Sequence, residues 1–286
     1  QMRSGSVMTR SPLFSLLALA LGLTLWGCGT PSPVGQRVPD FTEAEGTAPG
    51  AFDPEAFNFL IVGDWGRNGF FNQAEVADAM GRVGASIESR FTISTGDNFY
   101  LAGVTGVDDV KWDRSFESIY TAASLQSRWY SVLGNHDWHH QPDRIRQVTT
   151  QDAGWTDVAS RSVAWEHHGH RLEIAGTELP WMGRHPEFEP KTDGTFRLLL
   201  SHTPDHIDWA AGQDVDLVLA GHNHGGQVCL PLIGPVYSPS RFGVRFAAGD
   251  FQHGPTTMIV SRGLSGRHPL RYLCRPELTR IVLRAE

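Results

Sequence analysis

The sequence lacks the features that mark several classes of protein. Its 286 residues include only three cysteines, too few for a small scaffold held together by disulfides. The 24 lysines and arginines are outnumbered by 31 aspartates and glutamates, and a net charge of −7 argues against a nucleic-acid partner. The 31 glycines and 17 prolines follow no three-residue period, which excludes a collagen-like chain. Hydrophobic residues make up 40% of the chain, which excludes general disorder and permits one large core.

An apolar run near the amino terminus is too short to cross a bilayer comfortably. It covers residues 13–26 and follows Arg10, whereas a spanning helix needs about 20 apolar residues. A charged start, a short apolar core and then small residues are typical of a secretory signal. The run ends in Leu25-Trp26-Gly27-Cys28-Gly29, which resembles the processing site of bacterial lipoproteins, where the cysteine becomes the lipidated first residue.

These features predict three segments. Residues 1–28 are a signal peptide with a lipoprotein-type Cys28, residues 29–55 are a flexible linker, and residues 56–286 form one folded domain. We expect an exported bacterial lipoprotein, periplasmic or at the cell surface, that is held at a membrane by its lipid anchor. An ordinary signal peptide or a short anchor helix is the alternative.

Short apolar runs alternate with polar loops through the domain. They predict buried strands at residues 58–62, 91–94, 129–133, 197–200 and 216–220, and a hairpin at 163–175. Strands that alternate with helices early and dominate late favour sheet layers with helices outside.

One helix has a clear sequence pattern. Asn72 followed three residues later by Glu75 predicts a capping-box start. Apolar residues at spacings of three and four, from Val76 to Ile87, predict that the helix continues to about Arg90.

Five of the predicted strands end in loops that carry ligand-type side chains. The loops supply Asp64, Asp97, Asn135 with His136, His202, and His222 with His224. Ligand sites of layered α/β folds lie at the carboxyl ends of strands, and the glycines in these loops let the backbone approach closely. Carboxylates, an amide oxygen and imidazoles together suit divalent or trivalent first-row metals. We therefore expect the five loops to converge on a metal centre.

Other residues near these loops allow more than one interpretation. Trp65 and Phe99 are expected to wall the pocket because they neighbour ligands, and His139 either lines the pocket mouth or lies on a solvated loop. Cys229 and Cys274 are either a disulfide or two free thiols.

The order of the five loops resembles the calcineurin-like metallophosphoesterase superfamily. The resemblance implies a four-layer αββα sandwich of the metallo-dependent phosphatase type, with a dinuclear metal centre and a catalytic domain over residues 56–286. It implies that Asp64 and His224 bind the first metal and that Asp97 bridges the two. It assigns the second metal to Asn135, His202 and His222, and it assigns protonation of the leaving oxygen to His136.

The first loop departs from the usual pattern of the superfamily. Gly66 stands where most members have a histidine ligand, as it does in the purple acid phosphatase branch, which supplies a tyrosine three residues after the bridging aspartate. Tyr100 occupies that position here. A phenolate is a hard anionic ligand, so we expect two metal ions, Fe(III) with Zn, Mn or Fe(II). The alternative is that Tyr100 only packs and a water takes the ligand position.

The carboxyl half resembles another branch. His202-Thr203-Pro204-Asp205 and residues 216–228 look like the YkuE-like bacterial phosphodiesterases, a membrane-associated branch related to hydrolases of the UDP-diacylglucosamine pyrophosphate bond. The two resemblances together imply a metal-dependent phosphoric ester hydrolase. Metal-bound hydroxide would attack a phosphomonoester or phosphodiester, with His136 as general acid. The alternatives are a membrane-tethered hydrolase of a lipid-linked pyrophosphate and a metal-binding lipoprotein without turnover. The substrate is thus a small phosphate ester or a lipid, and the oligomeric state stays open.

Overall fold

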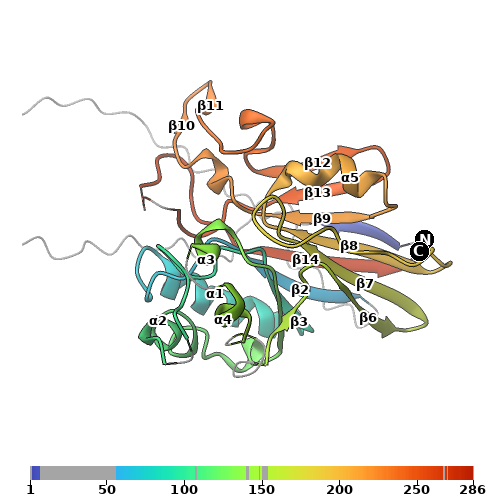
Figure 1. The fold of residues 1–286 in the computed structure, drawn as a ribbon, viewed down its shortest axis with the longest axis horizontal. Helices are drawn as coiled ribbons and strands as arrows, with labels where there is room; N and C mark the ends of the chain where they lie inside the picture. Colours follow the sequence, from blue (N-terminus) through green and yellow to red (C-terminus); the bar gives the residue numbers. More distant parts are fainter. Residues whose placement is uncertain are drawn as a thin grey trace, which may run out of the picture.

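Two large mixed sheets form the centre of the molecule (Figure 1). The computed structural model describes residues 2–6, 56–106, 108–139, 142–147, 149, 154–266, 268 and 270–285. The first sheet has the strand order β1-β14-β2-β3-β4-β5, and the second has the order β12-β13-β9-β8-β7-β6.

The strands of the first sheet are β1 (Met2–Ser6), β14 (Thr279–Ala285), β2 (Phe57–Val62), β3 (Phe91–Ser94), β4 (Arg128–Ser131) and β5 (Thr156–Asp157). Those of the second are β12 (Gly249–His253), β13 (Thr256–Val260), β9 (Leu217–Ala220), β8 (Thr195–Ser201), β7 (His170–Thr177) and β6 (Ser162–His167). A separate pair is β10 (Cys229–Leu230) and β11 (Gly234–Pro235). The α-helices in the described ranges are α1 (Gln73–Ser86), α2 (Val110–Trp112), α3 (Asn135–Trp138), α4 (Pro142–Gln147) and α5 (Ile207–Ala211).

The sheets and helices form four layers. Side chains that alternate along the strands fill the cores between these layers. In β2, Phe59 and Ile61 point into the core between the two sheets, whereas Leu60 and Val62 pack with α1 on the outer face. A third core lies between the second sheet and α5. The predicted four-layer αββα sandwich is therefore confirmed.

Helix α1 differs from its prediction at both ends. Its N-cap Asn72 has φ 70° and makes no side-chain capping bond, and the helix ends at Ser86 rather than near Arg90. The first turn is held instead by Gln73, whose Oε1 accepts from the N–H of Arg67 at 2.8 Å and that of Gly69 at 2.9 Å. Bonds from the preceding loop to the side chain of Gln73 thus take the place of the predicted capping box.

The amino-terminal region contains one described strand. Strand β1, which the sequence does not predict, pairs antiparallel with β14 at the edge of the first sheet. The predicted apolar run at residues 13–26, Cys28 and the linker at 29–55 lie outside the described residues. Among the described residues, no helix is both long and apolar enough to cross a membrane.

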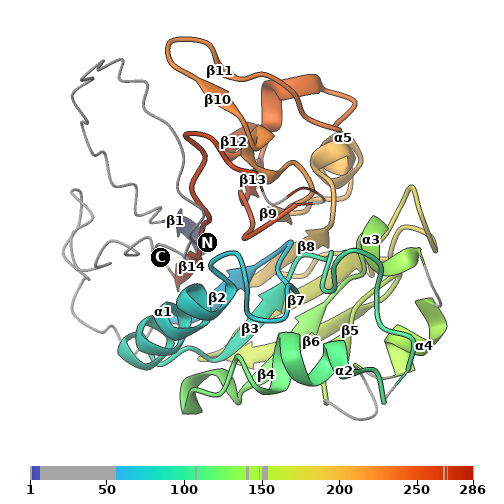
Figure 2. The ribbon, with the colours of Figure 1, turned by 90° about the vertical axis from the view of Figure 1, so that its left-hand side faces the viewer.

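The parallel strands of both sheets direct their loops to one place. β2, β3 and β4 run parallel in the first sheet, and β7, β8, β9 and β13 run parallel in the second. Their carboxyl ends lie at the same end of the sandwich, where α3 and the β10–β11 hairpin are also found (Figure 2).

Candidate metal centre

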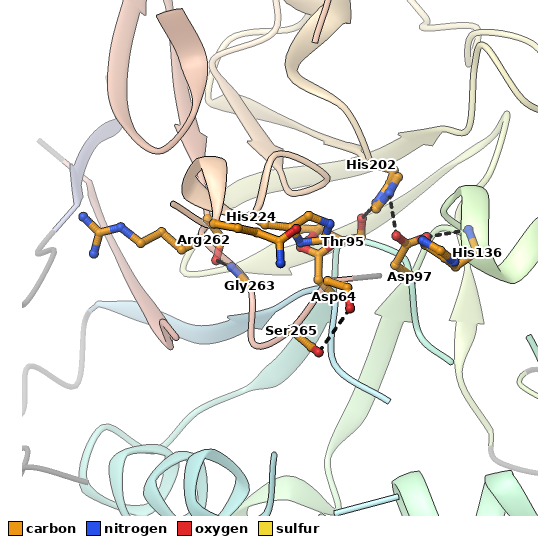
Figure 3. Close-up of polar contacts among 12 residues, drawn as sticks. Asp64, Thr95, Asp97, His136, His202, His224, Arg262, Gly263 and Ser265 are labelled. Carbon is orange, nitrogen blue, oxygen red and sulfur yellow. Dashed lines mark hydrogen bonds and ion pairs between the residues drawn. The ribbon is translucent and has the colours of Figure 1, made fainter. Parts of the chain in front are cut away.

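The five predicted loops meet, and their ligand-type side chains form two overlapping groups. One group contains Asp64, Asp97 and His224, and the other contains Asp97, His202 and His222. Within each group the candidate ligand atoms all lie within 4.8 Å of one another. Asp97 belongs to both groups, which is the geometry expected of a carboxylate between two cations. Figure 3 shows how Asp64, Asp97 and the histidines converge from opposite sheets.

Apart from Asp97, these side chains and Asn135 have buried ligand atoms with no hydrogen-bond partner in the described part of the protein. They are both carboxylate oxygens of Asp64, Oδ1 of Asn135, Nε2 of His202, Nδ1 of His222 and Nδ1 of His224. Buried polar atoms are nearly always hydrogen-bonded, so a cluster of exceptions requires another partner. Oxygen and imidazole nitrogen atoms at these separations fit metal ions as that partner.

Hydrogen bonds fix the orientation of two of the imidazoles. Nδ1 of His202 lies 2.8 Å from the carbonyl of Thr95, and because a carbonyl only accepts, Nδ1 carries the proton. The opposite nitrogen, Nε2, is the one available to a metal ion and lies 3.4 Å from Oδ2 of Asp97. His136 is held in the same way, with Nδ1 donating to the carbonyl of Leu101 at 2.6 Å. Bonds of this kind set the tautomer of metal-site histidines.

Burial and neighbouring charges shift the pKa values of the candidate ligands. Burial raises the pKa of Asp64 to about 7, with His202 lowering it and Asp97 raising it. Burial and the charge of His202 lower the pKa of His222 to about 3, and burial and Arg271 lower that of His224 well below its usual range. Neutral imidazoles next to buried carboxylates are the state that binds metal.

The backbone around the ligands is tight. Asp64, Asp97, His222 and His224 all have positive φ, between 50° and 67°, a region that non-glycine residues rarely occupy. Such conformations cluster at functional sites, where the surrounding fold compensates their cost. At Gly134, an added Cβ would lie 2.2 Å from Oδ1 of Asp97, so no larger residue fits between this loop and the ligands.

Gly66 and Tyr100 are linked structurally. A Cβ at Gly66 would lie 2.0 Å from the carbonyl oxygen of Asn98, so the loop leaves no room for a histidine there. The N–H of Tyr100 donates to the carbonyl of Gly66 at 2.9 Å. The hydroxyl of Tyr100 donates to Oδ2 of Asp97 at 3.1 Å, which places the phenol oxygen beside the carboxylate that both ligand groups share. Burial and the charge of Asp97 raise the pKa of Tyr100 well above its ordinary value, so the site favours a phenol unless a cation is bound.

A cavity of about 640 Å³ opens beside the ligand groups. Asp97, Asn135, His136, His222 and His224 contribute to its lining. The structure therefore brings every predicted site residue to one region. Their roles as ligands, and that of His136 as an acid, stay predictions.

Three further expectations, two about the pocket wall and one about a disulfide, have different outcomes. His139 lies at the cavity, one of the two alternatives for it. Trp65 and Phe99 do not wall the cavity, because both are fully buried in the aromatic core under α1. The indole N–H of Trp65 finds a buried partner there, Oγ of Ser94 at 2.9 Å. Cys229 and Cys274 are free thiols, and both contact the carbonyl of Gly225.

One buried residue that holds the site together, Asp137, was not predicted from the sequence. The carboxylate of Asp137 accepts from the N–H groups of Asn98, Phe99 and Gly134 at 2.9–3.0 Å, and from the side-chain amide of Asn98 at 2.9 Å. It joins the loop of Asp97 to the loop of Asn135 and His136. The only sequence signal is its place directly after His136, in the loop Gly134-Asn135-His136-Asp137.

Several residues that form the cavity wall were also not predicted from the sequence. Gln227, Tyr237 and His268 line the cavity. Trp181 packs against the second ligand group, with ring centroids 5.4 Å from His202 and 5.0 Å from His222. These residues lie in loops without a strand-end pattern, so their positions depend on tertiary structure.

Several known proteins are similar to this chain in sequence. The family model described as calcineurin-like phosphoesterase matches residues 57–226. Purple acid phosphatase 7 of Arabidopsis thaliana is 50% identical over 97 residues, 34% of this chain and 30% of that protein. The uncharacterized metallophosphoesterase YkuE of Bacillus subtilis (strain 168) is 38% identical over 163 residues, 54% of this chain and 55% of that protein.

A third relative is similar over a longer stretch. Phosphodiesterase YaeI of Escherichia coli (strain K12) is 28% identical over 185 residues, 62% of this chain and 68% of that protein. The chain thus spans less than a third of the length of the purple acid phosphatase and about half of YkuE. The match of the family model extends from β2 through the loop of His222 and His224. The chain belongs to the calcineurin-like phosphoesterase family.

Proposed function

We propose that the protein is a dinuclear-metal phosphoesterase that hydrolyses phosphomonoesters or phosphodiesters. The observation that carries the proposal is the pair of ligand groups that share Asp97, in which the buried ligand atoms of Asp64, His202, His222 and His224 have no hydrogen-bond partner among the described residues. The names of the relatives, phosphatases and phosphodiesterases, support the same reaction class.

The proposed ligands divide between two metal ions. Asp64, His224 and Tyr100 would hold the first, Asn135, His202 and His222 would hold the second, and Asp97 would lie between them. When bound, two such ions clamp both oxygens of an in-line displacement and lower the pKa of a coordinated water from 15.7 to roughly 7. The chain itself contributes the fixed positions of these side chains.

His136 is proposed as the general acid. Its Nδ1–H is used by the carbonyl of Leu101, so Nε2 is the nitrogen left for a substrate in the cavity. Its backbone N–H donates to Oδ1 of Asp97 at 2.8 Å, which holds the ring beside the ligand groups. A protonated Nε2 can therefore donate to the departing oxygen.

The metal pair proposed is Fe(III) with Zn, Mn or Fe(II). The position of the Tyr100 hydroxyl, 3.1 Å from Oδ2 of Asp97, supports a phenolate ligand to the first ion. A trivalent ion suits the hard oxygen donors of Asp64, Tyr100 and Asp97 in a buried site.

We also propose export and a lipid anchor at Cys28, on the sequence of residues 10–29 alone. Incorporation of labelled palmitate by the bacterial host tests this, with Cys28→Ala as the comparison. Label that is retained in Cys28→Ala would contradict the anchor.

A second candidate function is hydrolysis of a lipid-linked pyrophosphate. Exposed apolar side chains beside the cavity favour it, among them Tyr237, which is 68% exposed and lines the cavity. Such a substrate would place its phosphates in the same metal centre.

Metal analysis combined with two rate measurements tests the main proposal. We expect two metal ions per chain and hydrolysis of a bis-aryl phosphodiester or an aryl phosphomonoester. Asp97→Asn should lose metal and activity, whereas Asp78→Asn, a change on the exposed face of α1, should keep both. Absence of bound metal would contradict the proposal, and full metal with no rate on either ester would favour the lipid-linked pyrophosphate.

A further inference from the structure

Apolar side chains gather on the surface beside the mouth of the metal cavity. They come from the β10–β11 hairpin with the residues after it, and from the segment before Cys274. We call this set the apolar rim: Leu230, Leu232, Ile233, Val236, Tyr237, Leu270, Tyr272 and Leu273. Leu232 is 108% exposed and Ile233 is 73% exposed. A contiguous exposed apolar surface marks an interaction site. Figures 1 and 2 show the hairpin standing away from both sheets and from α2.

Backbone hydrogen bonds join the two parts of the apolar rim. The N–H of Cys229 donates to the carbonyl of Tyr272, and the N–H of Tyr272 donates to the carbonyl of Gln227, both at 2.9 Å. The N–H of Val236 donates to the carbonyl of Val228 at 3.2 Å, which closes the hairpin. The apolar side chains are therefore presented together on paired backbone.

The two stretches of chain that carry the apolar rim contain no acidic residues. Residues 225–249 and 263–276 contain no aspartate or glutamate, although the chain as a whole has a net charge of −7. Both stretches carry exposed arginines: Arg245 lies in the first, and Arg275 in the second directly follows Cys274, where the rim segment ends. Apolar side chains on stretches of chain that carry arginines and no carboxylates complement a surface of acyl chains under anionic headgroups.

The apolar rim continues into the cavity. Tyr237 belongs to the rim and lines the cavity with Gln227 and His268, and the side-chain amide of Gln227 donates to the carbonyl of Leu270 at 3.2 Å. A second copy of the chain or another protein on this surface would cover the cavity mouth. A bilayer on the same surface would deliver substrate to it.

We infer that the apolar rim docks on an anionic lipid bilayer, so that the metal centre acts on phosphate groups of membrane lipids. The docking is separate from the proposed anchor at Cys28 because it uses the folded domain itself. The substrate class, a phosphate or pyrophosphate ester whose apolar part stays in the membrane, rests on the proposed function. The docking does not, and it can be tested alone.

The first test measures hydrogen exchange of the metal-loaded full chain on vesicles of phosphatidylglycerol and phosphatidylcholine. The wild type is compared on the same vesicles with Leu232→Ser/Ile233→Ser, and rates are corrected for the changed side chains. We expect the backbone of residues 229–237 to exchange at least about ten-fold more slowly in the wild type, since both substituted side chains lose apolar burial. Val110→Ser, an exposed apolar residue on α2, should leave this protection unchanged.

A second test measures rates on a water-soluble bis-aryl phosphodiester and on an aryl phosphodiester with a long acyl chain held in the vesicles. Leu232→Ser/Ile233→Ser should lower the vesicle rate at least about ten-fold and leave the water-soluble rate within about two-fold. Equal exchange of residues 229–237 in the wild type and the double variant would overturn the docking. Slow exchange without vesicles, together with a dimeric mass, would also overturn it. Absence of any rate on either ester, with exchange protection present, would instead count against the proposed function alone.

Discussion

Replacement of Asp137 by asparagine tests whether one buried carboxylate positions the loops of the metal centre. The side chain of Asp137 is fully buried, and its two oxygens accept four N–H groups. An amide keeps one oxygen. If that oxygen takes the place of Oδ2, three bonds become bonds to a neutral acceptor, and the amide NH₂ faces the N–H of Phe99.

The magnitude follows from these contacts. A hydrogen bond to a charged group is worth about 1.5–3 kcal/mol and a neutral one about 0.5–1.5 kcal/mol, so three weakened bonds cost roughly 3 kcal/mol. The unpaired N–H of Phe99 adds about 1–3 kcal/mol. We expect Asp137→Asn to lower the free energy of unfolding by about 4–6 kcal/mol and metal affinity by about 10–100-fold, as for other groups that orient ligands.

Chemical denaturation and competition with a chelator measure the two effects. Asp109→Asn is the matched control, because Asp109 accepts from the backbone N–H of Lys111 at 3.0 Å and of Thr105 at 2.9 Å, at the start of α2. Because asparagine caps a helix about as well as aspartate, Asp109→Asn should cost less than about 1 kcal/mol and leave metal affinity unchanged. If Asp137→Asn is no less stable than Asp109→Asn and binds metal like the wild type, the positioning role is refuted.

Four further predictions concern the ligands and the acid. His136→Ala should keep its metal and lose about 10²–10⁴-fold in turnover, and a wild-type rate would exclude it as the acid. Tyr100→Phe should lose the visible charge-transfer band of the iron-loaded protein; a variant that stays coloured would exclude phenolate ligation. Gly66→Ala should lose at least about 1–3 kcal/mol in thermal unfolding, because its Cβ would lie 2.0 Å from the carbonyl of Asn98, and an unchanged melting temperature would contradict the tight contact. Burial alone would lower the pKa of His202, but Asp97 raises it to about 9, so this proton must leave when metal binds. Metal affinity should therefore rise about ten-fold per pH unit between pH 7.5 and 8.5, and affinity measured by chelator competition that is independent of pH would contradict this.

The ligand loops could be predicted because each follows a short apolar run. Once Phe57–Val62 and Leu217–Ala220 are recognised as strands, the residues after them must lie at a carboxyl edge. That logic placed Asp64 and His222 in one region although they are far apart in sequence. The hairpin around Gly169 was predicted for the same reason, since its pattern is local.

The remaining features depend on contacts that a sequence pattern does not contain. The start of α1 is held by Gln73, whose amide also donates to the carbonyl of Ser115 at 2.7 Å, a residue 42 positions away. Asp137 reaches Asn98 across a similar separation. Trp65 packs into the core, where its indole N–H donates a hydrogen bond to Ser94, rather than into the cavity. The apolar rim was not predicted, because exposure is a property of the folded surface.

Anomalous diffraction from crystals of the metal-loaded protein tests the central claim most directly. We predict two peaks about 3.5–4 Å apart, both within ligand distance of the Asp97 carboxylate. A single peak, or two peaks of which only one contacts Asp97, would contradict the account.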